Sequence, residues 1–183
     1  AEKTVNVKVY AKISSITSNI GIWDTEFSPK ATAYIIYVPK NTTSIKLTAQ
    51  HSGTLKSSDG KTFVNNVAKP ISVKDDETDI TLTYSCTGYT DSEYTLKIIK
   101  FEGTKTVVSE DGNGFNIKPF NVPIGSTIVL ALYDNGKLIE MQTEKYNNSN
   151  IPFTTDKSYT NAKVMAWESL ENMKPVCGVE IVK

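Results

Sequence analysis

The sequence predicts an all-β protein made of two tandem antiparallel β-sandwiches. Apolar and polar residues alternate over many short runs, which is the period of half-buried strands. Turn residues separate these runs at intervals of about 8–12 residues, as in β-sandwiches. Asn135-Gly136 lies between residues 128–134 and 137–142 and favours a tight hairpin turn whose twist matches paired strands.

The first predicted unit covers residues 1–102. Residues 4–13 are expected to open it as a strand, because every second residue from Val5 to Ile13 is apolar. Residues 14–21 are polar and turn-rich, and Pro29 keeps residues 22–34 from forming a central strand. Asp59-Gly60 predicts a second hairpin turn. The other expected strands of this unit are residues 33–38, 44–49, 79–86 and 93–101.

The second predicted unit covers residues 103–183. It begins in a boundary zone, residues 102–114, that holds three glycines and few large apolar groups. Pro119 interrupts the run 115–122 and predicts an edge strand there. The remaining expected elements are an edge strand over residues 151–154, a central strand over 162–167, one helical turn in 168–174 and a last strand over 176–182.

The composition argues against several classes of function. All 20 basic side chains are lysine, and they balance 20 carboxylates. Arginine is the residue suited to reading guanine edges, so its absence and the zero net charge argue against nucleic-acid binding. His51 is the one histidine, which excludes two-histidine catalysis and most zinc sites. No apolar run reaches the roughly 18 residues of a membrane span, and no signal peptide is visible at Ala1, as expected for a mature or excised fragment.

The two cysteines, Cys86 and Cys177, could form one disulfide or remain as two thiols. We favour free thiols, because the two residues fall in different predicted units. Cys86 and His51 could form a nucleophile and base. Cys86 lies on the predicted inward face of its strand, however, which favours a buried and unreactive thiol. No catalytic residue can be named, and we expect no enzyme activity and no cofactor.

Residues 15–101 resemble the cadherin-like β-sandwich domains of large secreted bacterial proteins. The resemblance is carried by Phe27-Ser-Pro29, by residues 34–39 and 45–49, and by residues 93–98 of the last strand. The sequence departs from the pattern of that family in the long segment 50–79 and in the polar residue Glu93. It implies a secreted protein with several domains.

Residues from about 104 to 183 are similar to an immunoglobulin-like accessory module of clostridial-type secreted proteins. Residues 130–138 and 162–176 carry this similarity. Such modules typically accompany surface proteins and polysaccharide-degrading enzymes. The two resemblances together imply an extracellular or cell-surface location and a non-catalytic role beside neighbouring domains of the same polypeptide.

Four residues are candidates for ligand binding: Trp23, Asp24, Glu26 and Tyr89. An exposed Trp23 beside the carboxylates of Asp24 and Glu26 would suit a sugar ring and its hydroxyls. The alternative is that Trp23 caps the end of the sandwich. Tyr89 is expected near the tip of a turn. Trp167 could also stack on a sugar, but core packing is favoured there, because large aromatic residues dominate sandwich cores.

The carboxylates at positions 75, 76, 77 and 79 could bind calcium, but a solvated turn is favoured because their spacing matches no EF-hand. No metal site is therefore predicted. The favoured function is a spacer or docking scaffold in a secreted bacterial protein linked to polysaccharide degradation or attachment. The alternatives are a carbohydrate-binding module and an adhesin module that binds a protein partner.

Overall fold

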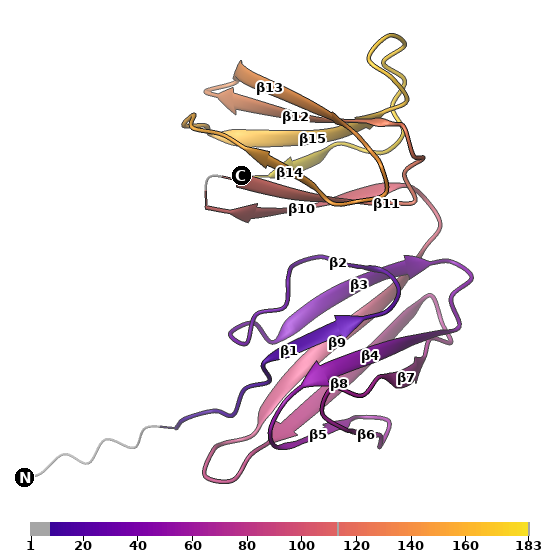
Figure 1. Cartoon of the computed structure of the whole chain (residues 1–183), viewed down its shortest axis with the longest axis vertical. Helices are drawn as coiled ribbons and strands as arrows, with labels where there is room; N and C mark the ends of the chain where they lie inside the picture. Colours follow the sequence, from indigo (N-terminus) through magenta and orange to yellow (C-terminus); the bar gives the residue numbers. More distant parts are fainter. Residues whose placement is uncertain (1–7, 113, 183) are drawn as a thin grey trace, which may run out of the picture. The chain divides into compact units, whose positions relative to one another are not determined.

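The computed structural model describes residues 8–112 and 114–182. Within these ranges every regular element is a β-strand, so the all-β prediction is confirmed. The chain divides into two compact units, Ala1–Phe101 and Glu102–Lys183. Each unit is a sandwich of two sheets, which Figure 1 shows as separate layers.

The first unit pairs a three-stranded sheet with a six-stranded sheet. The small sheet has the order β1-β4-β7, with bounds Ser15–Ser18, Ser44–Gln50 and Lys69–Ser72. The large sheet has the order β2-β3-β9-β8-β5-β6, with bounds Ile22–Trp23, Ala33–Pro39, Ser92–Phe101, Glu77–Ser85, Thr54–Ser57 and Thr62–Phe63. Strands β3 and β9 run parallel, whereas the other pairs of this unit are antiparallel.

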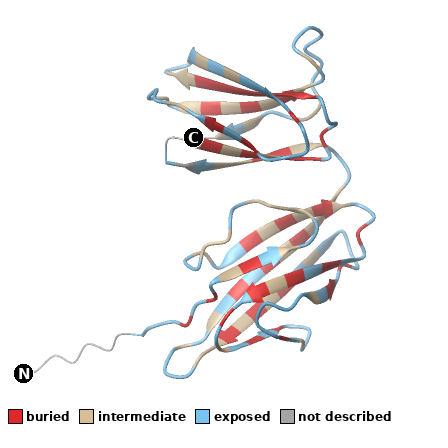
Figure 2. Cartoon of the chain, in the orientation of Figure 1, coloured by how far each residue is buried: buried red, intermediate tan, exposed pale blue. Residues whose placement is uncertain are grey.

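The second unit has sheets of three and four strands. The small sheet has the order β10-β11-β14, with bounds Lys105–Asp111, Gly114–Phe120 and Ile151–Thr154. The other has the order β13-β12-β15-β16, with bounds Lys137–Lys145, Thr127–Asp134, Asn161–Trp167 and Glu180–Val182. Each unit encloses its own cluster of buried apolar side chains, because alternate residues of each strand point inward. Figure 2 shows this alternation as stripes along the strands.

The two predicted hairpin turns are present. Asn135 and Gly136 both have positive φ, 48° and 81°, and the pairing of Asp134 with Lys137 places them at the centre of a two-residue turn. Gly60 has a φ of 83° in the turn that joins β5 to β6. Both turns therefore follow from the local sequence.

The predicted opening strand is wrong in its described part. Residues 4–7 lie outside the described residues, and residues 8–13 contain only an isolated bridge between Tyr10 and Thr90. Val9 is 56% exposed, although the alternation assigned it to the core, whereas Ala11 and Ile13 of the same predicted face are buried as expected. The strand forms instead as β1, in the polar segment predicted as a turn, because Ile16 can enter the core while β1 pairs with β4.

Strand β11 is a central strand and not the predicted edge. It pairs with β10 along its whole length, but it pairs with β14 only from Gly114 to Ile117. Pro119 lies beyond that second pairing, so its missing N–H removes no bond to β14. Residues 168–174 form turns and not a helix, although the Met173 N–H donates to the Ser169 carbonyl over 3.1 Å, as in one α-turn.

Three buried tyrosines hold loop backbone of the first unit through their hydroxyl groups. The Tyr34 hydroxyl accepts the Ser28 N–H over 3.0 Å and donates to the Ser28 carbonyl over 2.6 Å, and the Phe27 ring stacks on Tyr34 at 5.3 Å. Tyr94 accepts the Ile13 N–H, and Tyr84 accepts the Gly53 N–H. Burial is the main cause that raises the pKa of Tyr34 above its ordinary value.

We predict that Tyr34→Phe destabilises the first unit by about 1–3 kcal/mol, because Ser28 loses both its donor and its acceptor partner. Urea unfolding followed by Trp23 fluorescence, in a Trp167→Phe background, would measure this. Tyr89→Phe, at a side chain 53% exposed, is the matched control and should leave the midpoint unchanged. Equal midpoints for Tyr34→Phe and the control would contradict the role of the hydroxyl.

Candidate functional site

Trp23 ends the short edge strand β2 and is partly buried against the core of the first unit. Its indole N–H donates to the Ser18 hydroxyl over 2.9 Å. Its ring meets the Tyr34 ring edge-on, at a centroid distance of 5.5 Å. The polar atom and part of the ring of Trp23 are thus already used within the fold.

Asp24 and Glu26 follow Trp23 and differ in their roles. One oxygen of Asp24 accepts the N–H groups of Thr25 and Ile35, both over 2.9 Å. This carboxylate therefore fixes the start of the loop to strand β3. Glu26 is exposed in the same loop.

Tyr89 lies in the turn between β8 and β9 and lines an open pocket of about 340 Å³. We call this the tyrosine pocket, and six of its lining residues are Tyr10, Lys12, Ser52, Tyr84, Cys86 and Tyr89. Tyr10 and Tyr89 are 51% and 53% exposed, whereas Tyr84 is 2% exposed. The pocket thus combines two accessible aromatic rings with a buried aromatic floor.

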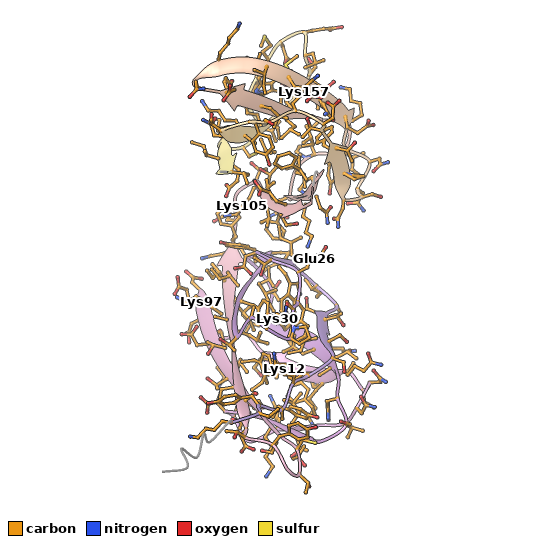
Figure 3. All side chains as sticks on the ribbon, turned by 90° about the vertical axis from the view of Figure 1, so that its left-hand side faces the viewer. Lys12, Glu26, Lys30, Lys97, Lys105 and Lys157 are labelled. Atoms are coloured by element: carbon orange, nitrogen blue, oxygen red, sulfur yellow. The ribbon has the colours of Figure 1, made fainter. Side chains whose placement is uncertain are left out.

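The structure does not bring the four predicted ligand-binding residues together. Strand pairing aligns Trp23 with Ile36 and then with Ile98, whereas Tyr89 lies beyond Ser92 at the other end of β9. The six residue-to-residue steps from Ser92 to Ile98 correspond to about 20 Å of strand. Figure 3 likewise shows Glu26 and Lys12, a lining residue of the tyrosine pocket, at different levels of the first unit. A shared site for Trp23 and Tyr89 is thus excluded by distance, while the binding role of each remains a prediction.

The second unit carries an apolar surface that sequence reasoning missed. We call it the outer face. It is the side of the β13-β12-β15-β16 sheet that points away from the core, and its members include Thr127, Val129, Ala131, Tyr133, Met141, Thr143, Lys145, Lys163, Met165, Trp167 and Ile181. Val129 and Ala131 are 0% and 2% exposed, although they do not belong to the enclosed core. Figure 2 shows β12 buried along most of its length and β13 largely exposed.

Trp167 does not belong to the enclosed core, so the expectation that it packs there is wrong. Ala162, Val164 and Ala166 occupy the inward positions of β15, so the period of two places Trp167 on the outer face with Met165 and Lys163. Lys163 is the sequence signal that could have shown this, because a lysine on the same side as Trp167 marks that side as the one nearer to solvent.

The carboxylates of the acidic turn form ion pairs with lysines. Asp76 lies 2.7 Å from the Lys40 ammonium and Glu77 lies 2.6 Å from the Lys97 ammonium. The hydrogen bond from Lys40 is the main cause that lowers the pKa of Asp76, and the bond to Glu77 raises the pKa of Lys97. Among residues 8–112 and 114–182, no group of three or more His, Cys, Asp or Glu side chains could hold a metal ion.

Both cysteines are free thiols and are partly buried. Cys86 lines the tyrosine pocket, and Cys177 packs against the core of the second unit. Burial is the main cause that raises the pKa of the Cys177 thiol. His51 is 7% exposed, and its Nδ1 lies 2.9 Å from the Gly53 carbonyl oxygen. Of the pair considered as nucleophile and base, His51 therefore contacts loop backbone and Cys86 is a partly buried thiol.

Comparison with solved structures gives a weak structural likeness. The chain matches no protein-family model and no curated protein, so the two resemblances seen in the sequence remain predictions. Among solved structures it is similar to dimeric latent PorU from Porphyromonas gingivalis, at 10% sequence identity and a TM-score of 0.37. The match covers 93% of this chain and 20% of that chain, so the chain spans about a fifth of that protein. In the described part of the chain, no helix is long and apolar enough to cross a membrane.

We predict that Cys177 alkylates more slowly in the folded protein than in urea at the same pH. A raised pKa leaves less reactive thiolate at pH 8, so its reaction midpoint should move to higher pH. Iodoacetamide labelling across a pH series, read by peptide mass spectrometry, measures this. A folded-state midpoint at or below that of the urea-unfolded chain would contradict burial of the thiol.

Proposed function

We propose that the chain is a non-catalytic accessory module of a secreted or cell-surface bacterial protein, where it acts as a docking scaffold for neighbouring domains. The observation that carries the proposal is the outer face of the second unit. The two sequence resemblances supply the secreted and multidomain context. The buried tyrosines and Asp24 support a scaffold, because the tyrosine hydroxyls bond to the backbone of loops and connecting segments and the Asp24 carboxylate bonds to the backbone of strand β3.

The outer face has the properties of a protein-docking surface. At its centre, Val129 and Ala131 are buried, with exposed fractions of 0% and 2%. Around them Met141 and Ile181 remain 55% and 64% exposed. Methionine adapts its shape to a partner, and apolar patches of this kind mark interaction sites.

The lysines of the outer face favour a partner that carries carboxylates, and we propose a neighbouring domain of the same polypeptide. Lys163 and Lys145 lie at the register positions of Ala131 and Thr127, next to the apolar centre. A partner with an apolar centre and carboxylates nearby would complement this surface. Tethering to such a domain raises its effective concentration, so a modest face is enough for docking.

Carbohydrate binding is the second candidate function, and the tyrosine pocket favours it. Its two exposed rings can stack on sugar C–H groups, and Ser52 and Lys12 offer polar atoms beside them. Its volume of about 340 Å³ lies in the range of small-ligand sites.

Methionine oxidation tests the docking proposal, because all three methionines are informative. Met141 and Met165 lie on the outer face, whereas Met173 lies in the loop after β15 and is 58% exposed. In a longer polypeptide that includes the neighbouring domains, we expect hydrogen peroxide to oxidise Met141 and Met165 more slowly than in this chain alone. Met173 serves as the internal reference. Unchanged rates at both outer-face methionines would contradict docking on this surface.

A further inference from the structure

We propose that the tyrosine pocket of the first unit binds a uronic-acid residue of an acidic polysaccharide. The inference rests on carbohydrate binding, the second candidate function above, and adds the class of sugar and the residues that recognise it. The site differs from the one expected at Trp23, because its aromatic rings come from Tyr10 and Tyr89.

The pocket has a fixed frame. The Ala11 N–H donates to the Thr90 carbonyl and the Thr90 N–H donates to the Val9 carbonyl, both over 2.9 Å. These bonds tie the segment that carries Tyr10 and Lys12 to the turn that carries Tyr89. Ser92 adds a third tie, since its hydroxyl donates to the Ala11 carbonyl. The two aromatic walls are thus held by backbone bonds and need little ordering when a ligand binds.

The floor of the pocket is fixed as well. The Tyr84 hydroxyl accepts the Gly53 N–H over 2.9 Å and lies 3.3 Å from the Ser52 hydroxyl. Gly53 is required for this contact, because a Cβ there would lie 2.2 Å from the Ser85 carbonyl oxygen and 2.9 Å from the Tyr84 ring. The Ser52 hydroxyl is therefore placed at the pocket by the same contact that anchors Tyr84.

The charge of the lining selects the class of sugar. Among the described residues that line the pocket, Lys12 is the charged side chain and none is a carboxylate. A lysine ammonium offers three donors and no acceptor, whereas the hydroxyl groups of a neutral sugar both donate and accept hydrogen bonds. A lysine beside tyrosines instead donates to a carboxylate, so the complement is a pyranose that carries one. Tyr10 and Tyr89 then contact the C–H groups of the ring, and Ser52 bonds to a hydroxyl.

Native affinity electrophoresis of the whole chain tests the proposal, with polygalacturonate as the probe, dextran as the neutral control and dextran sulfate as the control for charge alone. We expect retardation by polygalacturonate and little by dextran. Tyr89→Ala and Lys12→Gln should each weaken the retardation roughly tenfold, the upper range for one stacking or charge contact. Because Tyr89 and Lys12 are exposed, both variants should fold, and their circular dichroism should match that of the unchanged chain.

Two further variants make the result specific. Lys46→Gln removes an exposed charge from β4 of the same unit and should keep full retardation. Trp23→Phe should do the same. Equal losses in Lys12→Gln and Lys46→Gln, or equal retardation by dextran sulfate, would show attraction by charge alone and overturn the proposal. A loss confined to Trp23→Phe would assign the sugar to the other end of the unit and overturn it too.

The failure of the inference and that of carbohydrate binding are distinguishable. Retardation by dextran equal to that by polygalacturonate, and lost in Tyr89→Ala, would keep a sugar site in the pocket but contradict the selection of an acidic sugar. No retardation by any of the polysaccharides would contradict both. Neither outcome affects docking on the outer face, which methionine oxidation reads independently.

Discussion

The loops of the first unit depend on hydroxyl groups that come from inside its core. Tyr34, Tyr84 and Tyr94 are each buried to 2% exposure or less, yet each oxygen meets a backbone N–H of a loop or connecting segment. A buried loop N–H without a hydrogen-bond partner would destabilise the fold by about 1–3 kcal/mol. Tyrosine resolves this conflict, because its ring fills the core while its tip bonds to the connection. The floor of the tyrosine pocket is fixed by one of these bonds, the one from the Gly53 N–H to the Tyr84 hydroxyl.

The second unit follows a different constraint, the two-residue period of a strand. Strand β12 is buried on both sides. Leu130 and Leu132 point into the core, and Val129 and Ala131, which alternate with them, lie on the outer face. A sheet that faced only water on that side would place polar residues there. The apolar residues of β12 therefore serve two surfaces, one inside the sandwich and one outside it.

Local patterns predicted most of the fold, and the errors arose where pairing decided the outcome. Asn135-Gly136 specifies its turn by positive φ alone, so it could be identified without neighbours. Pro119 favours an edge position because a proline lacks the N–H donor, but in this sheet the pairing with β14 ends before Pro119. Val9 is exposed and Ile16 is buried, since alternation marks which residues can be buried and only pairing with β4 decides which strand forms.

The candidate sites show the same division. Trp23 and Tyr89 both read as aromatic residues near turns, and what separates them is whether the fold already uses their polar atom and ring. Tyr10 could not be connected with Tyr89 from the sequence, because some 80 residues lie between them and the bridge to Thr90 is a tertiary event. Each unit encloses its own core. Substitutions in the tyrosine pocket and on the outer face should therefore change the free energy of unfolding additively. Coupling between them would require an interaction that neither core provides, so additivity is a physical test of whether the two surfaces are independent.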